Sequence, residues 1–337
     1  MSSTAFLRDA GPAPVLSNRF LRAYVSTMRP YLMFVSGITG IVGMSLIPGV
    51  STGPALVLAA GFFLSYGFGQ ALTDCFQLDT DAISAPWRPM IQATLRRSRV
   101  LAISFAGLLV VGALLTAANP WNLPLVIAMV VGLATYTPFK RRWWAGPPWN
   151  SWIVALVCAS GILAAVGVAA PPVRREALTT TSVAGTLVAV FFGYMNFVLA
   201  GYFKDIEADR ATGYLTLPVV FGRKPAAYVS DLLAFAALAG AVAAVSPEIA
   251  HARIPALSVA GVGLFAGAGV SLIAQLRLHR VDTDETAYRA VVPVVQAYLL
   301  ILASVAAAHR PDWIGALAIF VVTGFVAIGA RPHRSQV

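Results

Sequence analysis

Apolar residues fill most of the chain in runs of about 20, the length that an α-helix needs to cross a bilayer. Short polar segments, several of them marked by Pro or Gly, separate these runs. The pattern predicts an all-α, multi-pass transmembrane bundle with nine core spans and a possible tenth at the C-terminal end. The expected spans are 31–49, 54–73, 98–117, 120–137, 151–171, 182–203, 226–246, 255–276, 288–308 and 312–331.

The composition agrees with a membrane protein. The chain is 58% hydrophobic and 11% charged, whereas soluble domains carry about 25% charged residues. Its two cysteines, Cys75 and Cys158, provide no disulfide framework, and we expect both to be buried. Residues 1–23 lack the apolar core of a signal peptide, so we expect them to form a cytoplasmic N-terminal segment.

The net charge of +10 does not indicate a nucleic-acid partner, because basic residues of membrane proteins gather in the loops on one side. If the N-terminus is cytoplasmic, the predicted spans place 20 of the 24 Lys and Arg residues on the cytoplasmic side. This asymmetry predicts an integral protein of a bacterial plasma membrane with both termini in the cytoplasm.

Two acidic clusters interrupt the apolar pattern, at 73–81 and 202–210, and together they hold six of the 14 acidic residues. Each follows a predicted span, where carboxylates are costly unless they have a function. If the second span continues as a helix through 70–81, Asp79 points away from a stripe of oxygen ligands suited to Mg²⁺. That stripe consists of Gln70, Thr73, Asp74, Gln77 and Asp81. A solvated helix end, capped by Asp79 or Asp81, is an equally supported alternative.

In the second cluster, Tyr202, Asp205 and Asp209 fall on one face of a continuous helix. Lys204 and Arg210 lie beside that face. Carboxylates can hold a metal while cations contact phosphate oxygens, so this arrangement suits a metal-bridged diphosphate. An ordinary charged loop with local ion pairs is the alternative.

Basic residues in three other loops are further candidates for phosphate contacts. They are Arg29, Arg88 and the run Lys140, Arg141 and Arg142. Topology alone favours a simpler interpretation, in which these residues anchor cytoplasmic loops.

Four motifs follow one another along the chain: Arg29-Pro30, the first acidic cluster through Arg88-Pro89, YTPFKR at 136–141 and KDIEADRATGYLTLPV at 204–219. This ordered set resembles the UbiA superfamily of intramembrane prenyltransferases over roughly residues 25–310. The spacing from Asp74 to Pro89 is similar to that of the chlorophyll synthase branch. We therefore expect a UbiA-like transmembrane prenyltransferase domain at 24–310, followed at 311–337 by a possible extra helix and a short tail.

The resemblance implies a lipid-open cavity in which Mg²⁺ holds a polyprenyl diphosphate of C10 to C20 chain length. Ionisation would give an allylic cation that alkylates a lipophilic, often aromatic, acceptor and releases diphosphate. The implied metal ligands are Thr73, Asp74, Gln77, Asp79, Asp81, Asp205 and Asp209. The implied diphosphate contacts are Arg29, Arg88, Lys140, Arg141, Lys204 and Arg210. The implied catalytic residues are Asp81, Asp205, Asp209, Arg88 and Lys140.

Several positions depart from the family pattern, among them the run 90–93, which lacks the Pro and Gly that commonly follow Arg88-Pro89 in the family. Thr73 and Gln77 stand where the family has Asn and Asp, and Tyr202 stands where the second motif often has Asp. Neutral oxygens bind Mg²⁺ less strongly than carboxylates, so we expect a weaker first metal site. The departures leave three hypotheses: a transferase with an unusual substrate, a UbiA-type terpene cyclase that needs no acceptor, and a non-catalytic membrane scaffold. A transporter is disfavoured, because the charged groups cluster at one membrane face and not at the midplane.

Overall fold

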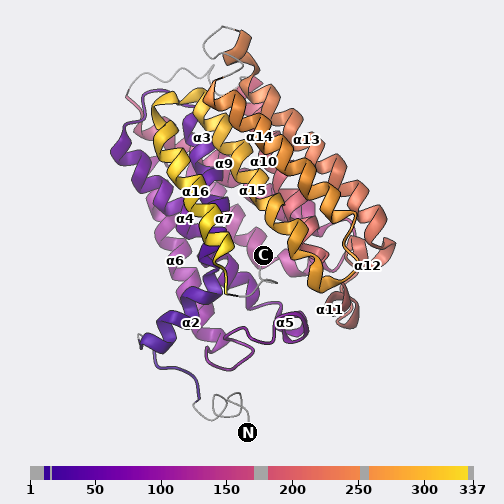
Figure 1. The fold of residues 1–337 in the computed structure, drawn as a ribbon. Coiled ribbons are helices and arrows are strands. Elements are labelled where there is room, and N and C mark those ends of the chain that lie inside the picture. Colours follow the sequence, from indigo (N-terminus) through magenta and orange to yellow (C-terminus); the bar gives the residue numbers. More distant parts are fainter. Residues whose placement is uncertain (1–10, 16, 171–180, 251–257, 333–337) are drawn as a thin grey trace.

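The computed structural model describes residues 11–15, 17–170, 181–250 and 258–332, and the regular structure within these ranges is helical (Figure 1). The first half contains α2 (Asn18–Met28), η1 (Pro30–Leu32), α3 (Met33–Ser45), α4 (Thr52–Asp74), α5 (Leu78–Ser84), α6 (Arg97–Ala118), α7 (Asn122–Ala134), α8 (Tyr136–Lys140) and α9 (Gly146–Val168). The second half contains α10 (Thr181–Tyr202), α11 (Ile206–Ala211), α12 (Leu217–Phe221), α13 (Arg223–Ala250), α14 (Val259–Leu278), η3 (Asp284–Thr286), α15 (Tyr288–His309), η4 (Pro311–Trp313) and α16 (Ile314–Gly329). The expected all-α fold class is confirmed.

Eight helical segments among the described residues are long and apolar enough to cross a membrane. They contain α4, α6, α9, α10, α13, α14, α15 and α16. The expected spans 31–49 and 120–137 instead contain shorter helices, α3 and α7, of 13 residues each. The chain is an integral membrane protein, and the number of times that it crosses the bilayer stays a prediction.

The bundle has an apolar outside and a packed interior. Val110 on α6, Phe265 on α14 and Ile319 on α16 are 71%, 83% and 70% exposed, as expected of side chains that face lipid. Helix α15 lies inside, where it packs against α3, α10, α13 and α14.

Small residues bring α3 and α9 into direct backbone contact. A Cβ atom added at Gly161 would lie 2.4 Å from the carbonyl oxygen of Gly40, and one added at Gly43 would lie 2.2 Å from that of Cys158. Membrane helices commonly use small residues for such close packing. The contact holds α9 firmly against the central helices.

The polar parts of the chain gather at one end of the bundle. Helices α2, α5, α11 and α12 all lie there, at the lower ends of the long apolar helices as drawn in Figure 1. Helices α5 and α11 contact each other, and the hydroxyl groups of Thr80 and Thr212 lie 3.3 Å apart. The fold thus brings together two acidic clusters that are far apart in the sequence.

Candidate active site

The first acidic cluster is not the continuous helix that we expected. Helix α4 ends at Asp74, and α5 begins only at Leu78. The last turn tightens, because the amides of Phe76 and Gln77 bond to carbonyls three residues earlier, at Thr73 and Asp74. Such bonds are common where a helix ends. The break contradicts the expected continuous helix over 70–81, although all five residues of the expected stripe still line one cavity.

The second cluster breaks in the same way. Helix α10 ends at Tyr202 and α11 begins at Ile206, so Tyr202 and Asp209 do not share one helix. The residues that precede the two short helices have similar backbone angles, with φ −128° and ψ 27° at Gln77 and φ −118° and ψ 11° at Asp205. Gln77 and Asp205 therefore occupy equivalent places in two similar turns, as do Asp81 and Asp209 four residues later.

A cavity of about 210 Å³ opens beside these turns. Apolar side chains of α4, α6, α7, α9 and α10 line its deeper part, as far as Phe62, which precedes Asp74 by about 18 Å along α4. The charged and oxygen-bearing side chains at its polar end include Arg29, Gln70, Thr73, Asp74, Gln77, Thr80, Asp81, Arg88, Tyr136, Lys140, Tyr202, Lys204 and Asp205. The cavity thus joins an apolar chamber to a charged mouth.

The first turn holds two arginines against its carboxylates. Arg29 donates to both oxygens of Asp74, at 2.9 and 3.0 Å, and Gln70 donates to one of them at 2.7 Å. Arg88 pairs with Asp81 and also approaches Asp74, at 3.6 Å. Burial raises the pKa of Asp81 even though Arg88 opposes the shift. The Asp74 carboxylate thus accepts hydrogen bonds from Arg29 and Gln70, whereas the negative charge of Asp81 is balanced by Arg88.

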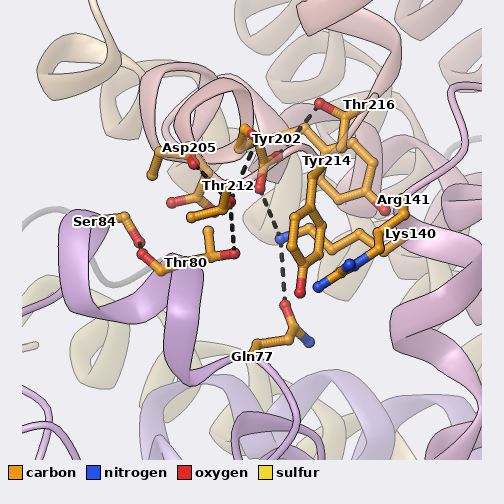
Figure 2. Close-up of polar contacts among 12 residues, drawn as sticks. Gln77, Thr80, Ser84, Lys140, Arg141, Tyr202, Asp205, Thr212, Tyr214 and Thr216 are labelled. Carbon is orange, nitrogen blue, oxygen red and sulfur yellow. Dashed lines mark hydrogen bonds and ion pairs between the residues drawn. The ribbon is translucent and has the colours of Figure 1, made fainter.

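Lys140 connects the two turns (Figure 2). Its Nζ donates to Gln77 Oε1 at 3.2 Å and pairs with Asp209 Oδ1 at 3.2 Å, and Thr216 donates to the other oxygen of Asp209 at 3.3 Å. Burial raises the pKa of Asp209 to about 6 against the opposing effect of Lys140. Burial alone would lower the pKa of Lys140, but Asp209 and Asp205 raise it. Lys140 therefore stays protonated beside the cavity.

Asp205 faces the cavity next to a second lysine. The Nζ of Lys204 lies 3.8 Å from Asp205 Oδ2. Burial opposes ionisation of Asp205, yet Lys204, Lys140 and Arg88 together hold its pKa below the usual range. Burial lowers the pKa of Lys204. Asp205 is therefore the carboxylate of the second turn that is both ionised and open to the cavity.

Four of the predicted site residues do not line the cavity. Asp79 accepts hydrogen bonds from Arg141 at 3.1 Å and Tyr214 at 3.3 Å, and its side chain is 43% exposed. Arg210 is exposed on α11. Asp209 is fully buried behind Lys140. The structure thus brings together most of the predicted set but separates Asp79, Arg141, Arg210 and Asp209 from the cavity itself.

A tyrosine pair at the site was not anticipated. The hydroxyl groups of Tyr136 and Tyr202 lie 2.9 Å apart, and both residues line the cavity. Gly146 makes room for the pair, because a Cβ atom there would lie 2.2 Å from the Tyr202 hydroxyl. Tyr136 belongs to the YTPFKR run and Tyr202 to the second acidic cluster, but no pattern in the sequence predicts that their hydroxyl groups meet.

The donor set fits Mg²⁺. Gln77, Asp81 and Asp205 present amide and carboxylate oxygens around the polar end of the cavity, and Asp81 Oδ2 is buried with an ion pair but no hydrogen bond. The described residues contain no cluster of three or more Asp, Glu, His and Cys that could enclose a metal. Mg²⁺ usually takes one or two carboxylates and completes its shell with water and substrate phosphate, so Asp81 and Asp205 with the Gln77 amide are a sufficient donor set.

Comparison with other proteins agrees with this geometry. The UbiA prenyltransferase family model matches residues 36–295. Digeranylgeranylglyceryl phosphate synthase of Thermococcus kodakarensis is 27% identical over 289 residues, which cover 84% of this chain and 96% of that protein. The chloroplastic chlorophyll synthase of Oryza sativa subsp. japonica is 27% identical over 200 residues, which cover 56% of this chain and 48% of that protein.

Solved structures show the same fold. A UbiA homolog from Aeropyrum pernix K1 in its apo form superposes with a TM-score of 0.64 at 22% identity, over 87% of this chain and 96% of that one. A UbiA homolog from Archaeoglobus fulgidus bound to DMAPP and Mg²⁺ superposes with a TM-score of 0.60 at 16% identity, over 91% of this chain and 99% of that one.

Proposed function

This chain belongs to the UbiA prenyltransferase family, and from that premise we propose that it transfers a prenyl group from a prenyl diphosphate to a lipophilic acceptor, with Mg²⁺ as cofactor. The observation that carries the proposal is the pair of acidic turns, interleaved with Arg88, Lys140 and Lys204, at the mouth of an apolar cavity. A diphosphate suits the charged mouth, and a prenyl chain suits the apolar chamber.

The metal would lie between the two turns. Gln77 and Asp81 would contribute ligands from the first turn and Asp205 from the second. Bound Mg²⁺ would neutralise charge on the diphosphate and favour its departure. Asp74 is already engaged by Arg29 and Gln70, so its role in this proposal is to hold Arg29 in place.

Basic side chains would stabilise the leaving group. When the bond between the allylic carbon and oxygen breaks, the diphosphate keeps the electron pair and gains negative charge. Lys140 and Arg88, fixed in advance by Asp209 and Asp81, would meet that charge without rearrangement, which is the most effective form of electrostatic catalysis. The acceptor would then form its new bond at the same carbon and lose a proton, which the released diphosphate can take up.

Two chemical classes of acceptor are proposed. The name of the Thermococcus kodakarensis relative refers to a glyceryl phosphate that carries geranylgeranyl groups, so a glyceryl phosphate lipid is the first acceptor to test. An aromatic acceptor is the second, as the resemblance to the family implied. Terpene cyclisation remains an outcome of the same experiment.

The test uses purified protein in lipid nanodiscs with Mg²⁺ and prenyl diphosphates of C10 to C20. We expect diphosphate release and a prenylated product, by mass spectrometry, only when an acceptor is present. Asp205→Asn should lower turnover about a hundredfold, whereas Asp282→Asn, an exposed loop carboxylate, should leave it unchanged. Cyclic hydrocarbon without an acceptor would contradict the transferase assignment, and equal turnover in both variants would contradict the site.

A further inference from the structure

The second acidic turn has an unusual helix start. Asp205 precedes α11 at the N-cap position, but its side chain makes no capping hydrogen bond. An N-cap aspartate normally accepts a hydrogen bond from the amide two or three residues later, because the first amides of a helix lack partners inside it. Asp205 has φ −118° and ψ 11°, so its carboxylate could take this capping position, away from the cavity, only if its backbone turned to the extended conformation of an N-cap residue.

A different aspartate occupies that position. Asp284, in the connection between α14 and α15, accepts a hydrogen bond from the backbone amide of Glu207 at 2.8 Å, through Oδ2. Glu207 is the second residue of α11, so this is one of the amides that an N-cap side chain would take. Asp284 thus caps α11 from 77 residues away.

The capping carboxylate is itself held in place. Arg223, at the start of α13, donates to Asp284 Oδ1 at 2.5 Å. The side chains of Arg223 and Asp284 are 30% and 14% exposed, so the pair is partly shielded from water and its geometry is restrained. One carboxylate therefore links α13, the α14–α15 connection and α11.

We propose that Asp284 is a positioning residue, which occupies the Glu207 amide and so keeps the Asp205 carboxylate turned toward the cavity, where it can bind a divalent cation. The inference rests on the proposed function. It assigns to the α14–α15 connection a part in assembling a site whose acidic residues all come from other loops. Without Asp284, Asp205 would fold back onto α11 and leave the cation.

The test measures cation binding directly. Mn²⁺ replaces Mg²⁺ and is titrated by electron paramagnetic resonance in the presence of a non-reactive prenyl thiolodiphosphate. Asp284→Ala should weaken Mn²⁺ binding about tenfold or more, as losses of supporting partners around metal sites do. Asp284→Asn keeps an oxygen that can accept from the Glu207 amide, so its binding should stay near that of the wild type. Asp282→Ala removes a carboxylate from the same connection and should leave Mn²⁺ binding unchanged.

Two further variants separate this role from simple helix capping. Arg223→Gln should weaken binding by less than Asp284→Ala, because Asp284 remains but is less restrained. In an Asp205→Asn background, Asp284→Ala should cause no further loss, since both act through one carboxylate. Wild-type affinity in Asp284→Ala, even with a lowered unfolding temperature, would overturn the inference. A wild-type protein that binds neither Mn²⁺ nor the analogue would instead refute the proposed function, and this inference with it.

Discussion

Lys140 shows how one residue can serve both the stability and the chemistry of the site. It is 4% exposed, and it joins the amide oxygen of Gln77 in the first turn to the buried carboxylate of Asp209 in the second. Breaking a buried ion pair by removing one partner leaves the other charge without compensation. Replacing Lys140 should therefore reduce the stability of the fold as well as any binding of diphosphate.

A pair of variants separates these two roles of Lys140. Lys140→Met should lower the free energy of unfolding by about 3 kcal/mol, because Asp209 loses its partner in a buried place. Adding Asp209→Leu should recover much of that stability, since an apolar pair of similar volume replaces the ions. Turnover should stay low in both variants. Full activity in the stable double variant would show that Lys140 is only structural.

Gln77 is one of the positions at which this chain departs from the pattern that the family resemblance implied. It occupies the same place in the first turn as Asp205 does in the second. Gln77→Asp adds a carboxylate at the polar end of the cavity and should lower the Mg²⁺ concentration that gives half-maximal activity. The measurement is a Mg²⁺ titration of turnover, with product analysis alongside it. An unchanged midpoint with altered products would place Gln77 against the substrate and not the metal.

At the scale of elements, the site depends on how closely helices approach. Helix α9 forms one wall of the cavity, and its position is set by contact with α3 at Gly40, Gly43 and Gly161. A side chain at Gly43 or Gly161 must push the two backbones apart, whereas one at Gly40 would meet the ring of Phe62 on α4. The glycines therefore influence the shape of the cavity although they lie outside its lining.

Alanine substitution tests this packing. Gly161→Ala should lower the free energy of unfolding by about 1–3 kcal/mol, because its Cβ atom overlaps the carbonyl oxygen of Gly40. Gly269→Ala on α14 is the matched control, since a Cβ atom there meets no atom within 4 Å. Alanine favours helix over glycine by about 1 kcal/mol, so the control should be neutral or slightly stabilising. Equal thermal stability of the two variants would contradict the proposed close contact.

At the scale of the whole molecule, the acidic segments are confined to one end of the bundle. The acidic turns, α2 and α12 lie at one end (Figure 1), the end that the basic residues predict to be cytoplasmic. Some residues that define the opposite side, Arg174, Arg175 and Arg253, lie outside the described residues. The sidedness therefore rests on the positive-inside pattern.

Cysteine labelling tests the sidedness without removing the native cysteines. Cys75 and Cys158 are 1% and 0% exposed, and burial raises the pKa of Cys75 to about 12, so native thiols should not react with a maleimide. Gln92→Cys, in the exposed loop between α5 and α6, should react only with reagent that reaches the cytoplasmic side. Labelling by an impermeant maleimide applied outside intact cells would reject the topology.

The sequence by itself determined the fold class, the approximate place of the long apolar helices and the loops that carry charge. These follow from local patterns: runs of apolar residues long enough for a bilayer, and carboxylates that are costly beside them. The family motifs then marked Asp81, Arg88, Lys140 and Asp205, all of which line the cavity.

Only the tertiary structure decided how those residues combine. The helix breaks fall at 75–77 and at 203–205, and neither break contains a Pro or a Gly. The contacts of Arg29 with Asp74, of Lys140 with Gln77 and of Asp284 with the Glu207 amide span 45, 63 and 77 residues. Side-chain periodicity describes one helix at a time, whereas these pairs depend on where different helices end and how they cross.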